Sequence, residues 1–337
     1  DHTTPIGNTG LIFNAGEEKS GPFTSSSVEG HSNTQSDFLT SPTFCGSCHD
    51  VFNYPSLRIE EAFTEYSQSP AAEEGTRCQD CHMGVEPGVA GDRPTGPSAV
   101  VEGEPYPDRE QSNHRFIGPD YSLLDDFPYP GDTTTSLAAQ EEYAGQVQTL
   151  LENAVHISNA IVTGGGTSHM LQVELASLTG GHNVPTGFTS ERQLWVHVEV
   201  VKDEAVVYAS GDLDSWGDLR NEHSWEVMGN QAELDTSLVN LQSKNLLRWS
   251  TGFPDSNLEL LETVFPFDAN YIYKQSLEPY EQRTYTWEIE GVSPPYRVDV
   301  ALNYRNLPPY VLRALQADEL VDRLRIFTID SVSMQVE

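Results

Sequence analysis

The chain has 337 residues, 37% of them hydrophobic, and it carries 18 Lys and Arg against 51 Asp and Glu, for a net charge of −33. This length suits one large domain or two ordinary ones. The charge excludes nucleic acid as a partner because two polyanions repel each other. The chain also has no run of 18 or more apolar residues that could span a membrane. It begins at Asp1 without an initiator Met, so we expect a mature product from which a leader was removed.

The first 135 residues show little regular patterning. Residues 1–44 are rich in Gly, Ser, Thr and Asn and predict loops. Apolar residues at helical spacing predict a helix from Ser56 to Ser67, with Ser56 as its N-cap. Residues 84–135 are rich in Gly and Pro and again predict irregular structure.

The pattern changes after about residue 136. A helix is expected over Ser136–Glu152, and a late one over Tyr310–Leu320 after two prolines. Alternating apolar residues predict many short strands. The candidates are 155–157, 171–175, 194–200, 206–209, 271–274, 283–288, 297–304 and 324–329. We therefore expect an α+β protein, with an irregular and helical region over residues 1–135 and a β-rich, sandwich-like domain over residues 136–337.

All four cysteines lie in two short motifs, Cys45-Gly46-Ser47-Cys48-His49 and Cys78-Gln79-Asp80-Cys81-His82. Each is a C-x-x-C-H sequence, the attachment signature of c-type haem. Two thiols bond the vinyl groups on one edge of the porphyrin, and the following His lies under the iron as the proximal ligand. The sequence therefore predicts two covalently attached haem c groups. The expected partners are Cys45, Cys48, Cys78 and Cys81 for the thioethers, and His49 and His82 for the iron.

Three other readings of the cysteines remain open at this point. Two C-x-x-C pairs can bind zinc or an iron–sulfur cluster, act as thioredoxin-like redox pairs, or close structural disulfides in tight rings. None of these needs His at both fifth positions, which only haem attachment explains.

Each iron also has a second axial position, which must be filled from elsewhere in the chain. We expect the distal ligands among His182, on a loop flanked by Gly and Pro, His114, close to Phe116, and His31, in a loop before Cys45. Met83 follows His82 directly and cannot reach the opposite face of that haem.

These residues resemble those of multihaem c-type cytochromes of the cytochrome c554-like group. The resemblance covers most of the chain, and it implies that His in H-x-F-x-G and G-H-x-x-P-T-G settings are distal ligands of bis-His, low-spin haems. Relatives usually carry more C-x-x-C-H motifs upstream, whereas this chain has two and therefore one spare distal candidate. The matching pieces are 21–23 with His31, 41–51, 78–83, 114–118, 181–187 and 306–310.

The expected function is electron transfer outside the cytoplasm, because haem is attached covalently there. The 33-residue offset between Cys45 and Cys78 places the two haems close together. Expected partners are other redox proteins or extracellular acceptors, and the spare His favours a homo-oligomer or filament that forms an extracellular wire. The alternatives are a multihaem reductase or dihaem peroxidase with one open haem, and a cell-surface, redox-linked binding module. The acidic residues are scattered, which favours a solvated surface, as in high salt, over a docking face for a basic partner.

Overall fold

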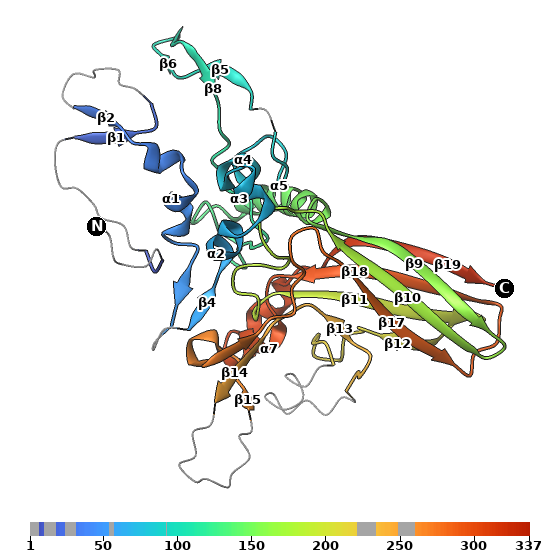
Figure 1. Ribbon diagram of the computed structural model, residues 1–337. Helices are drawn as coiled ribbons and strands as arrows, with labels where there is room; N and C mark the ends of the chain where they lie inside the picture. Colours follow the sequence, from blue (N-terminus) through green and yellow to red (C-terminus); the bar gives the residue numbers. More distant parts are fainter. Residues whose placement is uncertain are drawn as a thin grey trace.

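The computed structural model shows an irregular N-terminal region at one end of the molecule and long strands that extend to the other end, where the C-terminus lies (Figure 1). The expected α+β class, with a β-rich C-terminal region, is confirmed. The structure describes residues 7–9, 18–23, 32–53, 57–91, 93–220, 234–248 and 260–337.

The N-terminal region consists of short helices and two-stranded pairs joined by loops. Its helical elements are η1 (Asp37–Thr40), α1 (Pro42–Gly46), α2 (Ala62–Ser67), α3 (Pro70–Glu73) and α4 (Cys78–His82). Its strand pairs are β1 (Lys19–Gly21) with β2 (Asn33–Gln35), β3 (Val51–Phe52) with β4 (Arg58–Glu60), β5 (Thr95–Pro97) with β8 (Asp108–Glu110), and β6 (Val100–Val101) with β7 (Glu104–Pro105).

The helix α5 (Thr133–Glu152) connects this region to the long strands. The Asp132 carboxylate caps it by accepting from the backbone N–H of Thr135 at 3.0 Å. Val147 and Leu151 are buried on its inner face against the strands. The expected helix over Ser136–Glu152 is thus confirmed, with three more residues at its start.

Two antiparallel sheets form the β-rich part. One has the strand order β17-β10-β9 and the other β12-β11-β18-β19, with β13 paired to β11. The strands are β9 (Val155–Gly165), β10 (Ser168–Ser177), β11 (Gln193–Lys202), β12 (Ala205–Ser210), β13 (Val239–Asn240), β17 (Gln282–Glu290), β18 (Tyr296–Arg305) and β19 (Phe327–Val336).

The two sheets pack face to face around one hydrophobic core. In β10 every second residue, including Leu171, Val173 and Leu175, is fully buried, and in β11 Leu194, Val196 and Val198 are buried in the same way. Because successive side chains of a strand point to opposite faces, this alternation places one face of each sheet in the core. The two sheets therefore form the expected sandwich-like arrangement.

Smaller elements lie in the long connections of the sandwich. A three-stranded sheet has the order β15-β14-β16. These elements are β14 (Lys244–Arg248), β15 (Leu260–Glu262), η2 (Pro266–Asp268), β16 (Tyr271–Tyr273), α7 (Pro309–Ala314) and η3 (Asp318–Arg323).

Several sequence-based boundaries are wrong, among them the following three. The helix expected from Ser56 begins only at Ala62, because Arg58–Glu60 instead pairs with Val51–Phe52 as a strand; Ser56 itself lies outside the described residues. The late helix ends at Ala314, since Gln316 adopts a left-handed φ of 60°. The last strand begins at Phe327 rather than Leu324, which caps η3.

The N-terminal region is joined to the β-rich part by buried polar contacts. Asn53 is 8% exposed, and its amide donates to the carbonyls of Pro266, Phe267 and Ala269 at 3.3, 3.3 and 2.8 Å. The boundary expected between residues 135 and 136 falls in the first turn of α5. The division into two domains stays a prediction.

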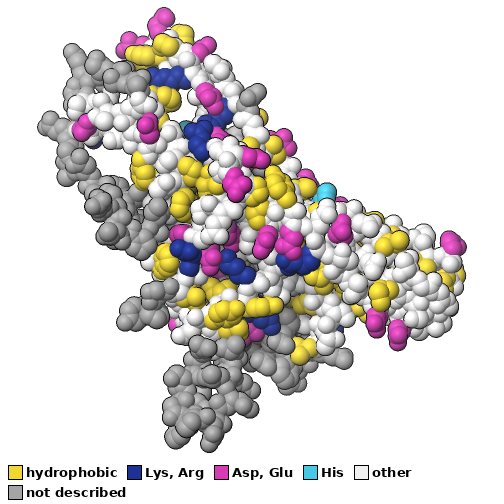
Figure 2. Space-filling view, in the orientation of Figure 1, with side chains coloured by type: hydrophobic (Ala, Val, Ile, Leu, Met, Phe, Trp, Pro, Cys, Tyr) yellow, Lys and Arg dark blue, Asp and Glu magenta, His cyan; other side chains and the backbone are white. Residues whose placement is uncertain are grey.

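Acidic side chains are spread over the face of the molecule in Figure 2, rather than gathered on one element. Several Lys and Arg side chains lie among them near the middle of that face (Figure 2). Within the described residues, none of the helices combines the length and apolar character that crossing a bilayer requires.

Candidate haem-binding site

The first motif lies on α1 and the turn after it. Pro42 occupies the first helical turn, where its missing N–H costs nothing. The backbone N–H groups of Cys48 and His49 both donate to the carbonyl of Cys45, at 3.0 and 2.9 Å. The two thiols and the His therefore project from adjacent turns. Gly46 is required here, because an added Cβ would lie 2.4 Å from the Phe63 ring of α2.

The second motif forms α4 itself, from Cys78 to His82. Asp80, between the two cysteines, accepts from the backbone N–H of Arg77 at 2.8 Å and pairs with its guanidinium at 2.8 Å. Arg93 pairs with the same carboxylate at 2.9 Å. Because these contacts close the first turn of α4, they hold the second motif in a helical conformation.

The two motifs lie against each other. The Gln79 amide of α4 donates to the carbonyl of Ser41, just before α1, at 3.0 Å. The Cys45 and Cys78 thiols interact directly; this contact lowers the pKa of Cys45 to about 7 although burial opposes the shift, and it raises the pKa of Cys78. The four cysteines form no disulfide with one another.

His82 is held in an orientation that leaves one ring nitrogen available. Its Nδ1 lies 3.0 Å from the carbonyl oxygen of buried Ile117. A carbonyl can only accept, so Nδ1 carries the hydrogen and Nε2 keeps its lone pair. Burial, together with nearby His182, lowers the pKa of His82 and favours the neutral form that binds metals.

His182 faces His82 from the β-rich part of the molecule. The two ring centroids are 6.2 Å apart, and the ring planes differ by 21°. His182 also holds its Nδ1 against a carbonyl, that of Asn183, at 2.9 Å. A metal between two imidazoles separates their centres by about 6 Å, because each contributes a metal–nitrogen bond of ~2.0 Å and a little over 1 Å within the ring. The pair thus fits the two axial ligands of one iron.

The His182 loop connects β10 in one sheet to β11 in the other, and it is fixed at several points. Val184 and Leu277 exchange two backbone hydrogen bonds, of 2.9 and 2.8 Å. The carbonyl of Gly180 accepts from the N–H of Ala71 at 3.0 Å, and an added Cβ at Gly180 would lie 2.5 Å from the Tyr280 hydroxyl. The Gly and Pro residues flanking His182 therefore belong to a fixed turn.

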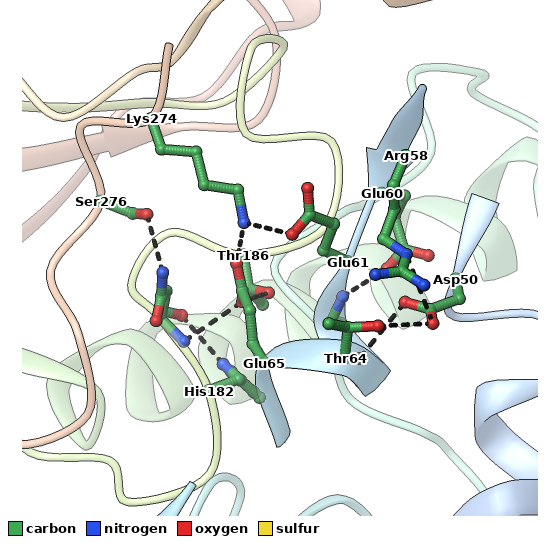
Figure 3. A network of polar contacts seen from close by, with 12 residues as sticks. Asp50, Arg58, Glu60, Glu61, Thr64, Glu65, His182, Thr186, Lys274 and Ser276 are labelled. Atoms are coloured by element: carbon green, nitrogen blue, oxygen red, sulfur yellow. Dashed lines mark hydrogen bonds and ion pairs between the residues drawn. The ribbon is translucent and has the colours of Figure 1, made fainter. Parts of the chain in front are cut away.

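A polar network joins this loop to α2 (Figure 3). Glu65 accepts from the Thr186 hydroxyl at 2.5 Å and from the Asn183 N–H at 3.3 Å. Lys274 pairs with Glu65 at 2.7 Å and with Glu61 at 2.9 Å. Burial opposes the charge on Lys274, but the two carboxylates outweigh it and raise its pKa.

The remaining candidate ligands are placed differently. His114 is exposed; its Nδ1 lies 2.9 Å from the carbonyl of Ser112, and its ring meets Phe116 edge-on at 6.1 Å. His49 is exposed as well, and neighbouring Glu60 raises its pKa. His31 lies outside the described residues. Of the expected distal ligands that the structure describes, it brings His182 to the expected proximal ligand His82.

Two site features have no signal in the sequence. Ile117 contributes a backbone carbonyl, which every residue type has, so its place behind His82 follows only from the fold. Glu65 is one acid among many in an acidic chain. The fixed positions of its hydrogen-bond partners on a distant loop are what distinguish it.

No protein-family model matches this chain, and no curated protein matches it by sequence. A solved structure with a similar fold is that of a penta-heme cytochrome c552 from Thermochromatium tepidum, with a TM-score of 0.55 and 15% identity. The match covers 92% of this chain and 60% of the cytochrome. The chain thus spans about three fifths of that protein's length, and the two share a fold.

Proposed function

We propose that this chain is an electron-transfer protein that carries two covalently attached haem c groups. Cys45, Cys48 and His49 hold the first haem; the 78–82 motif holds the second in the same way. Each haem supplies an iron that alternates between the ferric and ferrous states. The fold shared with a penta-heme cytochrome supports this assignment.

The observation that carries the proposal is the pairing of His82 with His182. Two histidines 100 positions apart in the chain lie at the separation that a shared iron requires, each with Nδ1 against a carbonyl. An Nδ1–H group bound to a carbonyl is the usual support of a metal-binding imidazole, because it fixes the ring and the tautomer. The pair would ligate the iron of the second haem through two imidazoles, an arrangement that would suit electron transfer more than substrate binding.

The contact between the motifs supports exchange between the two haems. With the Cys45 thiol against that of Cys78 and α4 bonded to the residue before α1, the two porphyrins attach to neighbouring points. Close porphyrins exchange electrons readily, so the pair acts as a short conduit. His31 and His114 are the proposed second ligands of the first haem. The one that this haem does not use serves a neighbouring copy, in a homo-oligomer or filament.

The proposed location is the periplasm, the cell surface or the extracellular space, since c-type haem is attached outside the cytoplasm. The proposed partners are other redox proteins or extracellular acceptors. If a partner has a basic surface, the net charge of −33 speeds its encounter with this chain, and the encounter slows as salt rises.

Optical spectra of the purified holoprotein test the proposal, together with a haem count from the alkaline pyridine haemochrome spectrum. We expect two haems per chain, low-spin ferric bands and a ferrous spectrum unchanged by carbon monoxide. In His182→Ala, one haem should become high-spin and bind carbon monoxide. His197→Ala, on a regular strand of the sandwich, is the matched control and should leave the spectra unchanged.

Two results would contradict parts of the proposal. Ready carbon monoxide binding by the unmodified protein indicates an open haem, as in a reductase or peroxidase. Unchanged spectra in His182→Ala exclude His182 as a ligand.

A further inference from the structure

The helix α2 contacts the segments of both candidate haem sites. At its start, the N–H of Phe63 donates to the carbonyl of His49 at 2.9 Å. Thr64 donates to the Asp50 carboxylate through its hydroxyl at 2.8 Å and its N–H at 3.2 Å. The next residue, Glu65, reaches the His182 loop instead (Figure 3). A single turn of helix therefore connects the proximal ligand of one haem to the distal ligand of the other.

Both carboxylate oxygens of Glu65 are used, in a side chain that is only 7% exposed. Oε1 accepts from Lys274, and Oε2 accepts from Thr186 and from the N–H of Asn183. Asn183 is the residue whose carbonyl holds Nδ1 of His182. Glu65 thus accepts from the backbone N–H of Asn183, the residue whose carbonyl orients the His182 imidazole.

We propose that Glu65, supported by Lys274, is a positioning residue that holds His182 in place as the axial ligand of the second haem. The inference rests on the proposed function, because it takes His182 as that ligand. Without the carboxylate, the Asn183 N–H and the Thr186 hydroxyl lose their acceptor and Lys274 loses one of its two counter-ions. Partly buried donors without partners are costly, so the loop shifts to hydrate them and His182 moves with it.

Glu61 provides a matched control. It precedes α2 directly, and its carboxylate pairs with the same Lys274 ammonium at 2.9 Å. Within the described structure it makes none of the contacts that Glu65 makes to residues 183 and 186. Removing Glu61 therefore changes the charge around Lys274 while leaving the loop bonded.

The test compares the full holoprotein with Glu65→Ala, Glu65→Gln, Glu61→Ala and His182→Ala, using ferric spin state and carbon monoxide binding to the ferrous form. Loss of the direct hydrogen-bond partner of a metal-bound His weakens ligation roughly 10- to 100-fold. Glu65 bonds the Asn183 N–H rather than His182 itself, so its loss should weaken ligation by less than this. We expect Glu65→Ala to give a high-spin, carbon monoxide-binding fraction of one haem, smaller than in His182→Ala. Glu65→Gln should partly restore the low-spin state, because its amide oxygen still accepts, and Glu61→Ala should match the unmodified protein.

The outcomes separate this inference from the proposed function. If His182→Ala leaves the spectra unchanged, the ligand assignment fails, and the positioning role fails with it. If His182→Ala responds but Glu65→Ala resembles Glu61→Ala, the positioning role is overturned and the ligand assignment stands. Should Glu65→Ala not fold, Thr186→Val removes one bond to the same carboxylate without stranding a charge. It should then shift the spin state in the same direction, and no shift overturns the inference.

Discussion

Among the histidines that the structure describes, His82, His182 and His114 hold Nδ1 within 3.0 Å of a backbone carbonyl. The carbonyl fixes the tautomer, so each ring offers Nε2 to a metal. Because the acceptors are main-chain atoms, substitution of a neighbouring side chain does not remove them. Ring orientation at these positions depends on the path of the backbone, which explains why the His182 loop is bonded at so many points.

Glu191, outside the haem site, is the clearest pH-sensitive group. Both of its carboxylate oxygens are buried without a hydrogen-bond partner in the described structure, and burial raises its pKa to about 8. Between its ordinary pKa of ~4.3 and 8, the unfolded chain loses this proton while the folded chain keeps it. The free energy of unfolding should therefore fall as pH rises through this window.

The substitution Glu191→Gln removes that dependence. Relative to the unmodified protein, its free energy of unfolding should rise by up to about 1.4 kcal/mol for each pH unit from 5 to 8, then level off. Urea unfolding at each pH measures the difference, with exposed Glu290→Gln as the control. A difference that stays constant over this range would show that Glu191 is ionised in the folded protein.

At the scale of elements, prediction from the sequence succeeds where an apolar pattern repeats over many residues. It fails where a very short strand pairs with another strand close to it in the chain. The alternation over 194–200 identifies β11, because a ten-residue strand buried on one face repeats its pattern several times. Arg58–Glu60 has only three residues, and its pairing with Val51–Phe52 overrides the helical spacing that continues into α2. His182 was among the expected ligands because Gly and Pro mark its turn, but nothing in the sequence indicates that His82 is its partner.

Asn53 is the main polar link between the β3–β4 hairpin and η2. Its amide donates to three carbonyls and its Oδ1 accepts from the N–H of Leu57 at 3.0 Å. Asn53→Ala should destabilise the fold by about 1–3 kcal/mol, because buried carbonyls lose their donor. Asn53→Asp should be worse at neutral pH, since it places a carboxylate against those oxygens.

Thermal unfolding of the two Asn53 variants at pH 7 and pH 4 checks this order. The extra loss in Asn53→Asp should shrink at pH 4, where protonation restores one donor. If Asn53→Asp is more stable than Asn53→Ala at pH 7, the hydrogen bonds from Asn53 to the carbonyls near η2 do not stabilise the contact between the β3–β4 hairpin and η2.

At the scale of the whole molecule, 51 acidic residues face 18 basic ones. The acids are dispersed over the face shown in Figure 2, so repulsion there acts across several elements rather than at one site. Salt reduces this repulsion because the Debye length falls from ~10 Å at 0.1 M to ~3 Å at 1 M. Partly buried pairs such as Lys274 with Glu65 are screened much less.

The midpoint of thermal unfolding should therefore rise between 0.1 M and 1 M sodium chloride. Scans in potassium chloride at the same concentrations separate general screening from a sodium-specific effect, and both salts should act alike. A midpoint that falls in both salts would mean that exposed ion pairs contribute more than repulsion.

The pairing of His82 with His182 also has a consequence for the chain as a polymer. In the proposed dihaem protein, an iron bound by both residues would close a loop of 100 residues, in addition to the thioether bonds that would fix the porphyrin to α4. In the chain-entropy estimate for a permanent cross-link, closing a loop of this length removes ~4.7 kcal/mol of freedom from the unfolded state. The bond between His182 and the iron would then act as a reversible cross-link between the N-terminal region and the sandwich. A strong exogenous iron ligand that displaces His182 should loosen the whole molecule as well as change its spectrum.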